Sequence, residues 1–210
     1  MTILEDIALR VERGDETSVG ELAQKALSEG ISAGEILNKG LVAGMEVVGE
    51  RFKKNEVFIP EVLVSARAMK AGMKIVNPLL GEAIMGSRGK VVIGTIKGDL
   101  HDIGKNIVGM LLEGAGFEVT DLGTDVTKEQ FMEVVEKEGV DIIGMSALLT
   151  TTMTYMKEVI QSVEDANLKG KVKVIIGGAP ITQSYAEEIK ADGYAPDAAS
   201  AVDLVKSLLE

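Results

Sequence analysis

The single histidine of the chain, His101, lies among residues whose types could hold a metal ion. Asp99 stands two positions before it and Gly104 three positions after it, directly beyond the apolar stretch 91–95. An imidazole ligates a metal through one ring nitrogen, and a carboxylate bonded to the other nitrogen orients the ring and makes it more basic. A glycine beside the ligand lets another group approach the backbone closely. The spacing predicts one axial metal ligand, His101, oriented by Asp99.

Two further runs of polar or small residues follow stretches that read as buried strands. The first extends from Ser146 to Thr152 and carries hydroxyl groups at positions 146, 150, 151 and 152. One hydroxyl is expected to cap the following helix, which leaves the others for the polar end of a long ligand. The second run is Gly177-Gly178, which fits either a plain tight turn or a backbone slot for a nucleotide tail.

The second half of the chain has the alternating pattern that would place these runs together. Short β-branched runs alternate with helical patterns, at 91–95, 117–119, 140–144 and 172–176. A fifth short strand is expected near Gly193, before a helix from about Asp197. This predicts an α/β domain over residues 89–210, a doubly wound five-stranded parallel sheet covered on both faces. Such sheets bind ligands beyond the carboxyl ends of their strands, where all three runs would lie.

The first 88 residues have helical periodicity instead. Capping-box spacings mark two helix starts, at Ser18 and at Ser32. Apolar residues recur every three or four positions over 37–52, and again in a helix that starts at Pro60 and runs to Leu80. Four helices with short connections predict a small antiparallel bundle, joined to the α/β domain by a linker at 82–90.

Composition excludes several classes of protein. The net charge is -11, from 33 acidic and 22 basic residues, so the basic surface that nucleic-acid binding needs is absent. The chain has no cysteine, which excludes disulfides and thiolate metal sites. Because the N-terminus is charged and no apolar stretch approaches ~18 residues, we expect neither a signal peptide nor a membrane span, and a cytoplasmic protein.

Taken together, the spacings resemble a known family. They are similar to the cobalamin-binding domain of methionine synthase and, more closely, to the small corrinoid proteins of methanogen and acetogen methyltransferase systems. The family pattern is D-x-H-x-x-G, about 41 residues, S-x-L, about 26 to 28 residues, and G-G. Here 41 residues separate Gly104 from Ser146, and 28 separate Leu148 from Gly177. Residues 44–52 and 58–69 resemble the family's helical cap, which covers the methyl-bearing face of the corrin.

The resemblance implies cobalamin or a related corrinoid as the cofactor, methylated on cobalt in its methylcobalamin form. His101 would be the cobalt ligand in place of the cofactor's own base, and Asp99 and Thr152 would complete a catalytic triad in which the family has Ser at the last position. Ser146 and Thr150 would contact the displaced nucleotide base. The implied cofactor contacts are Asp99, His101, Asp102, Gly104, Ser146, Leu148, Thr150, Gly177, Gly178, Phe52, Ile59 and Ala198. Ile59 stands where the family has Leu, and Ala198 belongs to an element where the family often has Asn.

The function that the resemblance implies is methyl carriage. A substrate-specific methyltransferase would load the corrinoid, and a second methyltransferase would unload it to coenzyme M or tetrahydrofolate. A reductive activase is a further expected partner, and no nucleic acid or membrane is expected. The chain would be a subunit of an enzyme system rather than a complete enzyme, with a cap that swings aside when a partner docks.

Three other functions remain open on the sequence. The chain could be the corrinoid-binding part of a mutase, although such domains lack a helical cap. It could be a cobalamin-dependent sensor, which usually carries an output domain. It could be a flavodoxin-like module for another ligand, which would leave Asp99, His101 and Ser146 without a shared role. The methyl donor is not specified among methanol, methylamines, quaternary amines and methoxylated aromatics.

Overall fold

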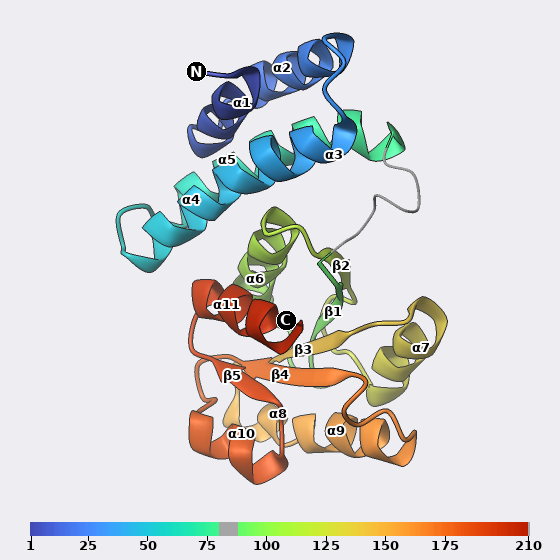
Figure 1. Cartoon of the computed structure of the whole chain (residues 1–210). Coiled ribbons are helices and arrows are strands. Elements are labelled where there is room, and N and C mark those ends of the chain that lie inside the picture. The colour runs from blue at the N-terminus through green and yellow to red at the C-terminus, as the bar shows by residue number, and fades with distance from the viewer. Residues whose placement is uncertain (80–87, 210) are drawn as a thin grey trace. The chain divides into compact units, whose positions relative to one another are not determined.

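The computed structural model describes residues 1–79 and 88–209, and the chain divides into two compact units (Figure 1). The first unit comprises Met1–Ser87 with Glu113–Gly116, and the second comprises Arg88–Leu112 with Phe117–Glu210. Among the described residues, every helix is either too short or too polar to cross a membrane.

The first unit is helical. Its elements are α1 (Ile3–Glu12), α2 (Glu16–Ser28), α3 (Ala33–Glu35), the π-helical η1 (Ile36–Val42), α4 (Ala43–Lys53), α5 (Ile59–Val76) and the 3-10 turn η2 (Asn77–Leu79). Because α3, η1 and α4 follow one another without a break, they form one rod, and the unit has the four helical rods that the sequence predicts. The rods bury aliphatic side chains such as Ile7, Val19 and Leu41 between them.

The predicted helix starts of this unit have mixed outcomes. Ser32 caps α3, because its hydroxyl accepts a hydrogen bond from the Glu35 N–H at 3.2 Å. The predicted start at Ser18 is wrong, since Asp15 caps α2 and accepts hydrogen bonds from both the N–H and the hydroxyl of Ser18. The carboxylate is the stronger acceptor, and it starts the helix earlier. The last helix begins one residue before Pro60 and ends at Val76, and position 80 lies outside the described residues.

The second unit contains the predicted parallel sheet. Its strands are β1 (Lys90–Thr95), β2 (Glu118–Asp121), β3 (Ile142–Ser146), β4 (Lys173–Gly177) and β5 (Gly193–Ala195). Its helices are α6 (Ile103–Gly114), α7 (Lys128–Glu138), α8 (Thr150–Met153), α9 (Met156–Asp165), α10 (Gln183–Ile189) and α11 (Ala198–Leu209). The five strands are all parallel and lie in the order β2-β1-β3-β4-β5. The doubly wound α/β fold is therefore confirmed.

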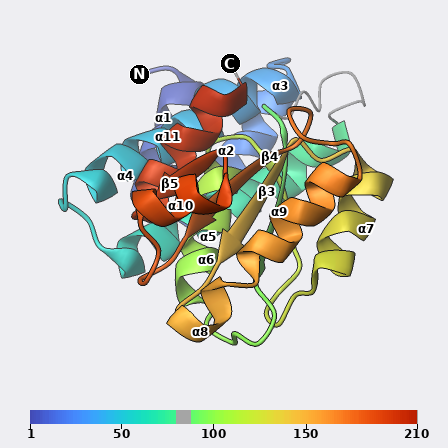
Figure 2. The same ribbon diagram turned by 90° about the horizontal axis from the view of Figure 1, so that it is seen from below.

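Helices cover both faces of this sheet, with α6 and α11 on one side and α9 and α10 on the other (Figures 1 and 2). Alternate strand residues point to opposite faces. Val92 and Ile143 belong to a core cluster that also contains Phe131 of α7 and Met156 of α9. Ile93 points the other way, and its Cδ1 would lie 2.8 Å from a Cβ added at Gly109 of α6. Burial on both faces explains why β1, β3 and β4 are mostly apolar, whereas the edge strand β2 is more polar and has no buried residue.

The strand order places the ligand-binding edge between β1 and β3. The chain leaves β1 for β2 on one side and then returns to β3 on the other, so the winding direction reverses there. Thr95 at the end of β1 pairs with Ser146 at the end of β3. The loops that follow these two strands therefore meet, as the switch-point rule for doubly wound sheets requires.

Several predicted boundaries are shifted. Ser146 and Gly177 are the last residues of β3 and β4, whereas the sequence places them after shorter strands. The strands extend further because ladder hydrogen bonds continue to the sheet edge, beyond the last β-branched residue. Most of the predicted linker, residues 82–87, lies outside the described residues, and Lys90 already belongs to β1.

Candidate functional site

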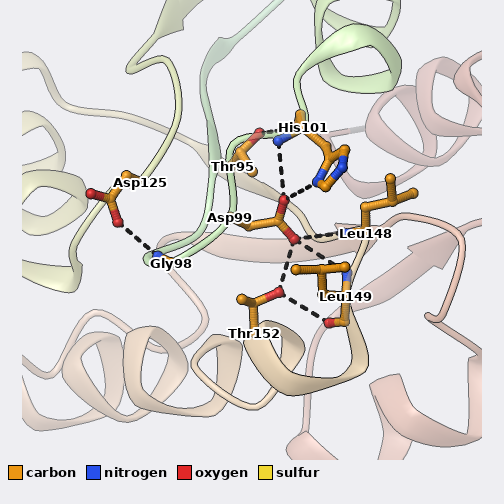
Figure 3. A network of polar contacts seen from close by, with 8 residues as sticks. All are labelled: Thr95, Gly98, Asp99, His101, Asp125, Leu148, Leu149 and Thr152. Atoms are coloured by element: carbon orange, nitrogen blue, oxygen red, sulfur yellow. Dashed lines mark hydrogen bonds and ion pairs between the residues drawn. The ribbon is translucent and has the colours of Figure 1, made fainter.

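The loop after β1 buries one carboxylate. Gly98 adopts a positive φ of 82° and lets the chain turn, so that the Asp99 N–H donates to the Ile96 carbonyl at 3.1 Å. The Asp99 side chain is fully buried and accepts five hydrogen bonds (Figure 3). Oδ1 accepts from the backbone N–H of His101 at 3.1 Å and lies 2.7 Å from its ring Nδ1.

The other carboxylate oxygen bonds the loop that follows β3. Asp99 Oδ2 accepts from the N–H of Leu148 at 2.8 Å, the N–H of Leu149 at 3.2 Å and the hydroxyl of Thr152 at 2.8 Å. The predicted group of Asp99, His101 and Thr152 is therefore one hydrogen-bonded network, and Leu148 joins it through its backbone. Asp99 connects the two loops that meet at the switch point.

These donors keep Asp99 ionised. Burial alone would raise the pKa of this carboxyl, but hydrogen bonds from Leu148, His101 and Thr152 outweigh it and hold the pKa far below the ordinary value of 3.8. A carboxylate can only accept hydrogen bonds, so the proton of a neutral His101 ring lies on Nδ1. The lone pair of the ring is then on Nε2.

The Nε2 side of His101 is open. The His101 side chain is 53% exposed, and no hydrogen bond from residues 1–79 or 88–209 reaches Nε2. Within these same residues, no group of three or more His, Cys, Asp or Glu side chains is placed to hold a metal. The site thus offers a metal one oriented nitrogen, and this fits a metal ion whose other donors belong to a cofactor.

The hydroxyl run after β3 differs in part from expectation. None of its hydroxyls caps α8, because Leu149 occupies the N-cap position without a side-chain hydrogen bond. Asp99, in the neighbouring loop, instead accepts from the N–H of Leu149 at the N-cap position and from the hydroxyl of Thr152. Ser146 is half-buried and Thr150 is exposed. Their contacts with a nucleotide base stay predictions.

The three predicted glycines of the site differ in why the position favours glycine. A Cβ on Gly178, whose φ is 125°, would lie 1.8 Å from the Ala147 carbonyl oxygen, and one on Gly177 would lie 3.1 Å from the Ala195 carbonyl oxygen. Chain packing therefore accounts for both, and a nucleotide slot there stays a prediction. A Cβ on Gly104 would meet nothing within 4 Å. The backbone beside His101 is therefore accessible to a ligand.

Four other predicted contacts lie apart from the Asp99 network. Asp102 accepts from the Asn106 side chain at 3.1 Å and holds the first turn of α6. Ala198 is half-buried at the start of α11. Phe52, half-buried in α4, and Ile59, 40% exposed at the start of α5, belong to the helical unit. The cofactor roles of all four stay predictions.

Sequence reasoning missed three residues that build the site. Leu149 donates to Asp99, and Asp125 accepts from the Gly98 N–H at 2.7 Å and donates its own N–H to the Asp99 carbonyl at 3.0 Å. Buried Thr95 donates its hydroxyl to the His101 carbonyl oxygen at 2.8 Å. A hydroxyl at the end of the otherwise aliphatic strand β1 was the available signal for Thr95.

Comparison with known proteins assigns the family. A family model described as a B12 binding domain matches residues 89–203, which include the whole Asp99 network, and a second model of the same description matches residues 3–77. The chain belongs to the B12-binding corrinoid proteins. It therefore binds cobalamin or a related corrinoid, as the sequence predicts.

Relatives of this corrinoid protein match it over nearly its whole length. A corrinoid protein of Desulfitobacterium hafniense (strain Y51) is 45% identical over 100% of this chain and 98% of its own. The dimethylamine corrinoid protein of Methanosarcina barkeri is 43% identical over 99% and 97%. Among solved structures, a chain of the methanol:cobalamin methyltransferase complex MtaBC from Methanosarcina barkeri is 32% identical, with a TM-score of 0.90 over 99% of this chain and 79% of that one.

Proposed function

We propose that this corrinoid protein carries a methyl group on cobalt between two methyltransferases, with His101 as the protein ligand of the metal. The observation that carries the proposal is the 2.7 Å contact between Asp99 Oδ1 and His101 Nδ1, with Nε2 left open. Relatives named for dimethylamine and trimethylamine, and one in a methanol methyltransferase complex, support a methyl carrier over a mutase subunit or a sensor.

When bound, the corrinoid supplies the cobalt that accepts and releases the methyl group. The chain supplies orientation and control of one proton. Asp99 fixes the imidazole with its proton on Nδ1, which keeps Nε2 free for cobalt.

The proposed partners follow from the relatives. A methyltransferase specific for a methylamine or for methanol would load the corrinoid. A second methyltransferase would pass the methyl group to coenzyme M or tetrahydrofolate, and a reductive activase would restore the protein after accidental oxidation. In the helical unit, Phe52 and Ile59 are proposed to face the methyl-bearing side of the corrin.

The ligand assignment can be tested by electron paramagnetic resonance of the protein loaded with cob(II)alamin. An axial ¹⁴N splits the cobalt lines into triplets, whereas ¹⁵N splits them into doublets. Because His101 is the sole histidine, uniform ¹⁵N-histidine labelling marks one side chain. We expect doublets from the labelled protein and triplets from the unlabelled one.

The control is His101→Ala, prepared with and without the same label. It should bind corrinoid without any splitting that responds to the label. Triplets that persist in labelled wild-type protein would mean that the cofactor's own base, and not His101, holds the cobalt. That result would overturn the proposed ligation.

A further inference from the structure

The backbone of His101 is held by a second side chain besides Asp99. His101 lies between β1 and α6, outside either element, and its side chain is 53% exposed, so packing does little to hold it. Its two backbone polar groups are instead held by side chains. The N–H donates to Asp99 Oδ1 at 3.1 Å, and the carbonyl oxygen accepts from Thr95 Oγ1 at 2.8 Å (Figure 3).

Thr95 is itself a rigid anchor. It is fully buried at the last position of β1. Its N–H donates to the Gly123 carbonyl at 3.0 Å, and its carbonyl accepts from the Val126 N–H at 2.9 Å. A β-branched side chain has few χ1 rotamers. The hydroxyl is therefore fixed in relation to the sheet.

The hydroxyl of Thr95 has no structural purpose in the strand itself. A buried hydroxyl is unfavourable unless it is hydrogen-bonded, and valine would fill the same volume in an otherwise aliphatic strand. The hydrogen bond that Thr95 makes goes to the residue proposed to ligate cobalt. Asp99 controls how the imidazole is turned, while Thr95 controls where its backbone stands above the sheet edge.

We propose that Thr95 is a positioning residue for the axial ligand, holding the His101 main chain at the height from which Nε2 reaches cobalt. This inference rests on the proposed function of His101. Metal–nitrogen bonds to histidine are short, about 2.0 to 2.1 Å in zinc sites, so small displacements of the backbone weaken them. Without the hydroxyl, the main chain of the His101 loop gains freedom, and the ligand-off form becomes more populated.

The test compares Thr95→Val, which keeps the volume and removes the hydroxyl, with Thr95→Ser, which keeps the hydroxyl. Each is labelled with ¹⁵N-histidine and loaded with cob(II)alamin, and the fraction of cobalt showing the histidine doublet is measured. One neutral hydrogen bond corresponds to a roughly five- to tenfold shift of the ligation equilibrium toward ligand-off in Thr95→Val. Thr95→Ser should stay within about twofold of wild type.

A matched control separates positioning from stability. Ile93→Val removes a buried methylene from the same strand, where the Ile93 side chain lies beside Gly109 of α6 and Gly144 of β3. It should lower the thermal midpoint and leave the doublet fraction unchanged. If Thr95→Val does not fold, Thr95→Ala, which introduces no new γ atoms, is measured in its place.

The outcomes are distinguishable. A folded hydroxyl-free variant with the wild-type doublet fraction overturns the role of Thr95, provided that His101→Ala has lost the doublet. An equal loss in Thr95→Val and Thr95→Ser also overturns it, because the hydroxyl would then not matter. If labelled wild-type protein shows no doublet at all, the proposed function fails first and this inference fails with it.

Discussion

Asp99→Asn is the most informative single change, because it removes a charge while keeping the shape of a side chain with five donors around it. The amide must turn its oxygen toward one group of donors. Facing it toward Leu148, Leu149 and Thr152 satisfies three donors, and its NH2 then meets the backbone N–H and ring of His101. The opposite orientation would leave three donors without an acceptor and is less favourable.

The energetic cost follows from this geometry. The N–H of His101 loses its acceptor, which costs roughly 1 to 3 kcal/mol, and the three bonds to the remaining oxygen lose their charge assistance. Together these reduce the free energy of unfolding by about 3 to 5 kcal/mol. The ring must also accept from the NH2 through Nδ1, so its proton moves to Nε2. Losing a charge-assisted bond of about 1.5 to 3 kcal/mol shifts the tautomer ratio roughly 10- to 150-fold.

Both effects can be measured on the protein without a cofactor. Protonated and unprotonated ring nitrogens give well-separated ¹⁵N signals, and a chain with one histidine gives one pair. At about pH 8.5, where an ordinary imidazole is neutral, wild type should show the proton on Nδ1 and Asp99→Asn should show it on Nε2. Urea unfolding gives the stability difference.

Asp125→Asn is the matched control. It removes one negative charge from the loop between β2 and α7. The new amide oxygen can still accept from the Gly98 N–H, and asparagine tolerates the φ of 56° at this position. Its tautomer and stability should remain close to wild type. An Asp99→Asn protein that keeps the proton on Nδ1 would refute the reasoning that the carboxylate selects the tautomer.

Three further predictions concern acid stability, glycine and charge burial. Folding lowers the pKa of Asp99, so its ionised form contributes fully to the free energy of unfolding above pH 3.8, and this contribution is lost as the pH falls toward the pKa in the folded state. Acid should therefore destabilise wild type more steeply than Asp99→Asn in circular-dichroism titrations. A comparable slope in both would contradict this. Gly178→Ala should reduce the free energy of unfolding by about 3 kcal/mol or more, because of the close contact and the positive φ at this position. Gly104→Ala should have a free energy of unfolding within about 1 kcal/mol of wild type, yet bind hydroxocobalamin more weakly. Unimpaired binding by Gly104→Ala would mean that no ligand approaches there. The Lys105 side chain is 3% exposed and its Nζ is paired with Asp121, whose side chain is 41% exposed. Asp121→Asn should therefore reduce the free energy of unfolding by about 3 kcal/mol and Lys105→Met by much less, and equal losses in chemical denaturation would refute that asymmetry.

The sequence predicts those parts of the molecule that depend on local pattern. Short β-branched runs identify the strands of the parallel sheet, and apolar repeats every three or four residues identify the helical rods, because burial demands them. Asp99 and His101 are close in the chain, so their contact could be predicted from the motif. Strand ends are less predictable, since ladder hydrogen bonds carry β3 on to Ser146 without a local signal.

The unpredicted features depend on contacts between distant residues. Asp99 accepts hydrogen bonds from Leu148 and Thr152, across 49 to 53 residues of sequence. Asp125 contacts Gly98 across 27 residues. Such side-chain hydrogen bonds can be predicted only when the strand order is known. At the start of α2, the carboxylate of Asp15 caps the helix in place of Ser18, whose spacing fits a capping box. The π-helical stretch in the first unit likewise carries no recognised sequence signal.

The hydrogen bonds from the start of α8 to Asp99 also have a consequence for how the protein matures. Leu149 gives this short helix no side-chain cap, and the Leu149 N–H and the Thr152 hydroxyl gain their shared acceptor only once β1 and β3 have paired and placed Asp99 beside them. Pairing across such a sequence separation is entropically slow. The imidazole of His101 and the first turn of α8 should thus become ordered together, late in folding. A newly made chain would then gain its affinity for corrinoid only when the sheet has formed.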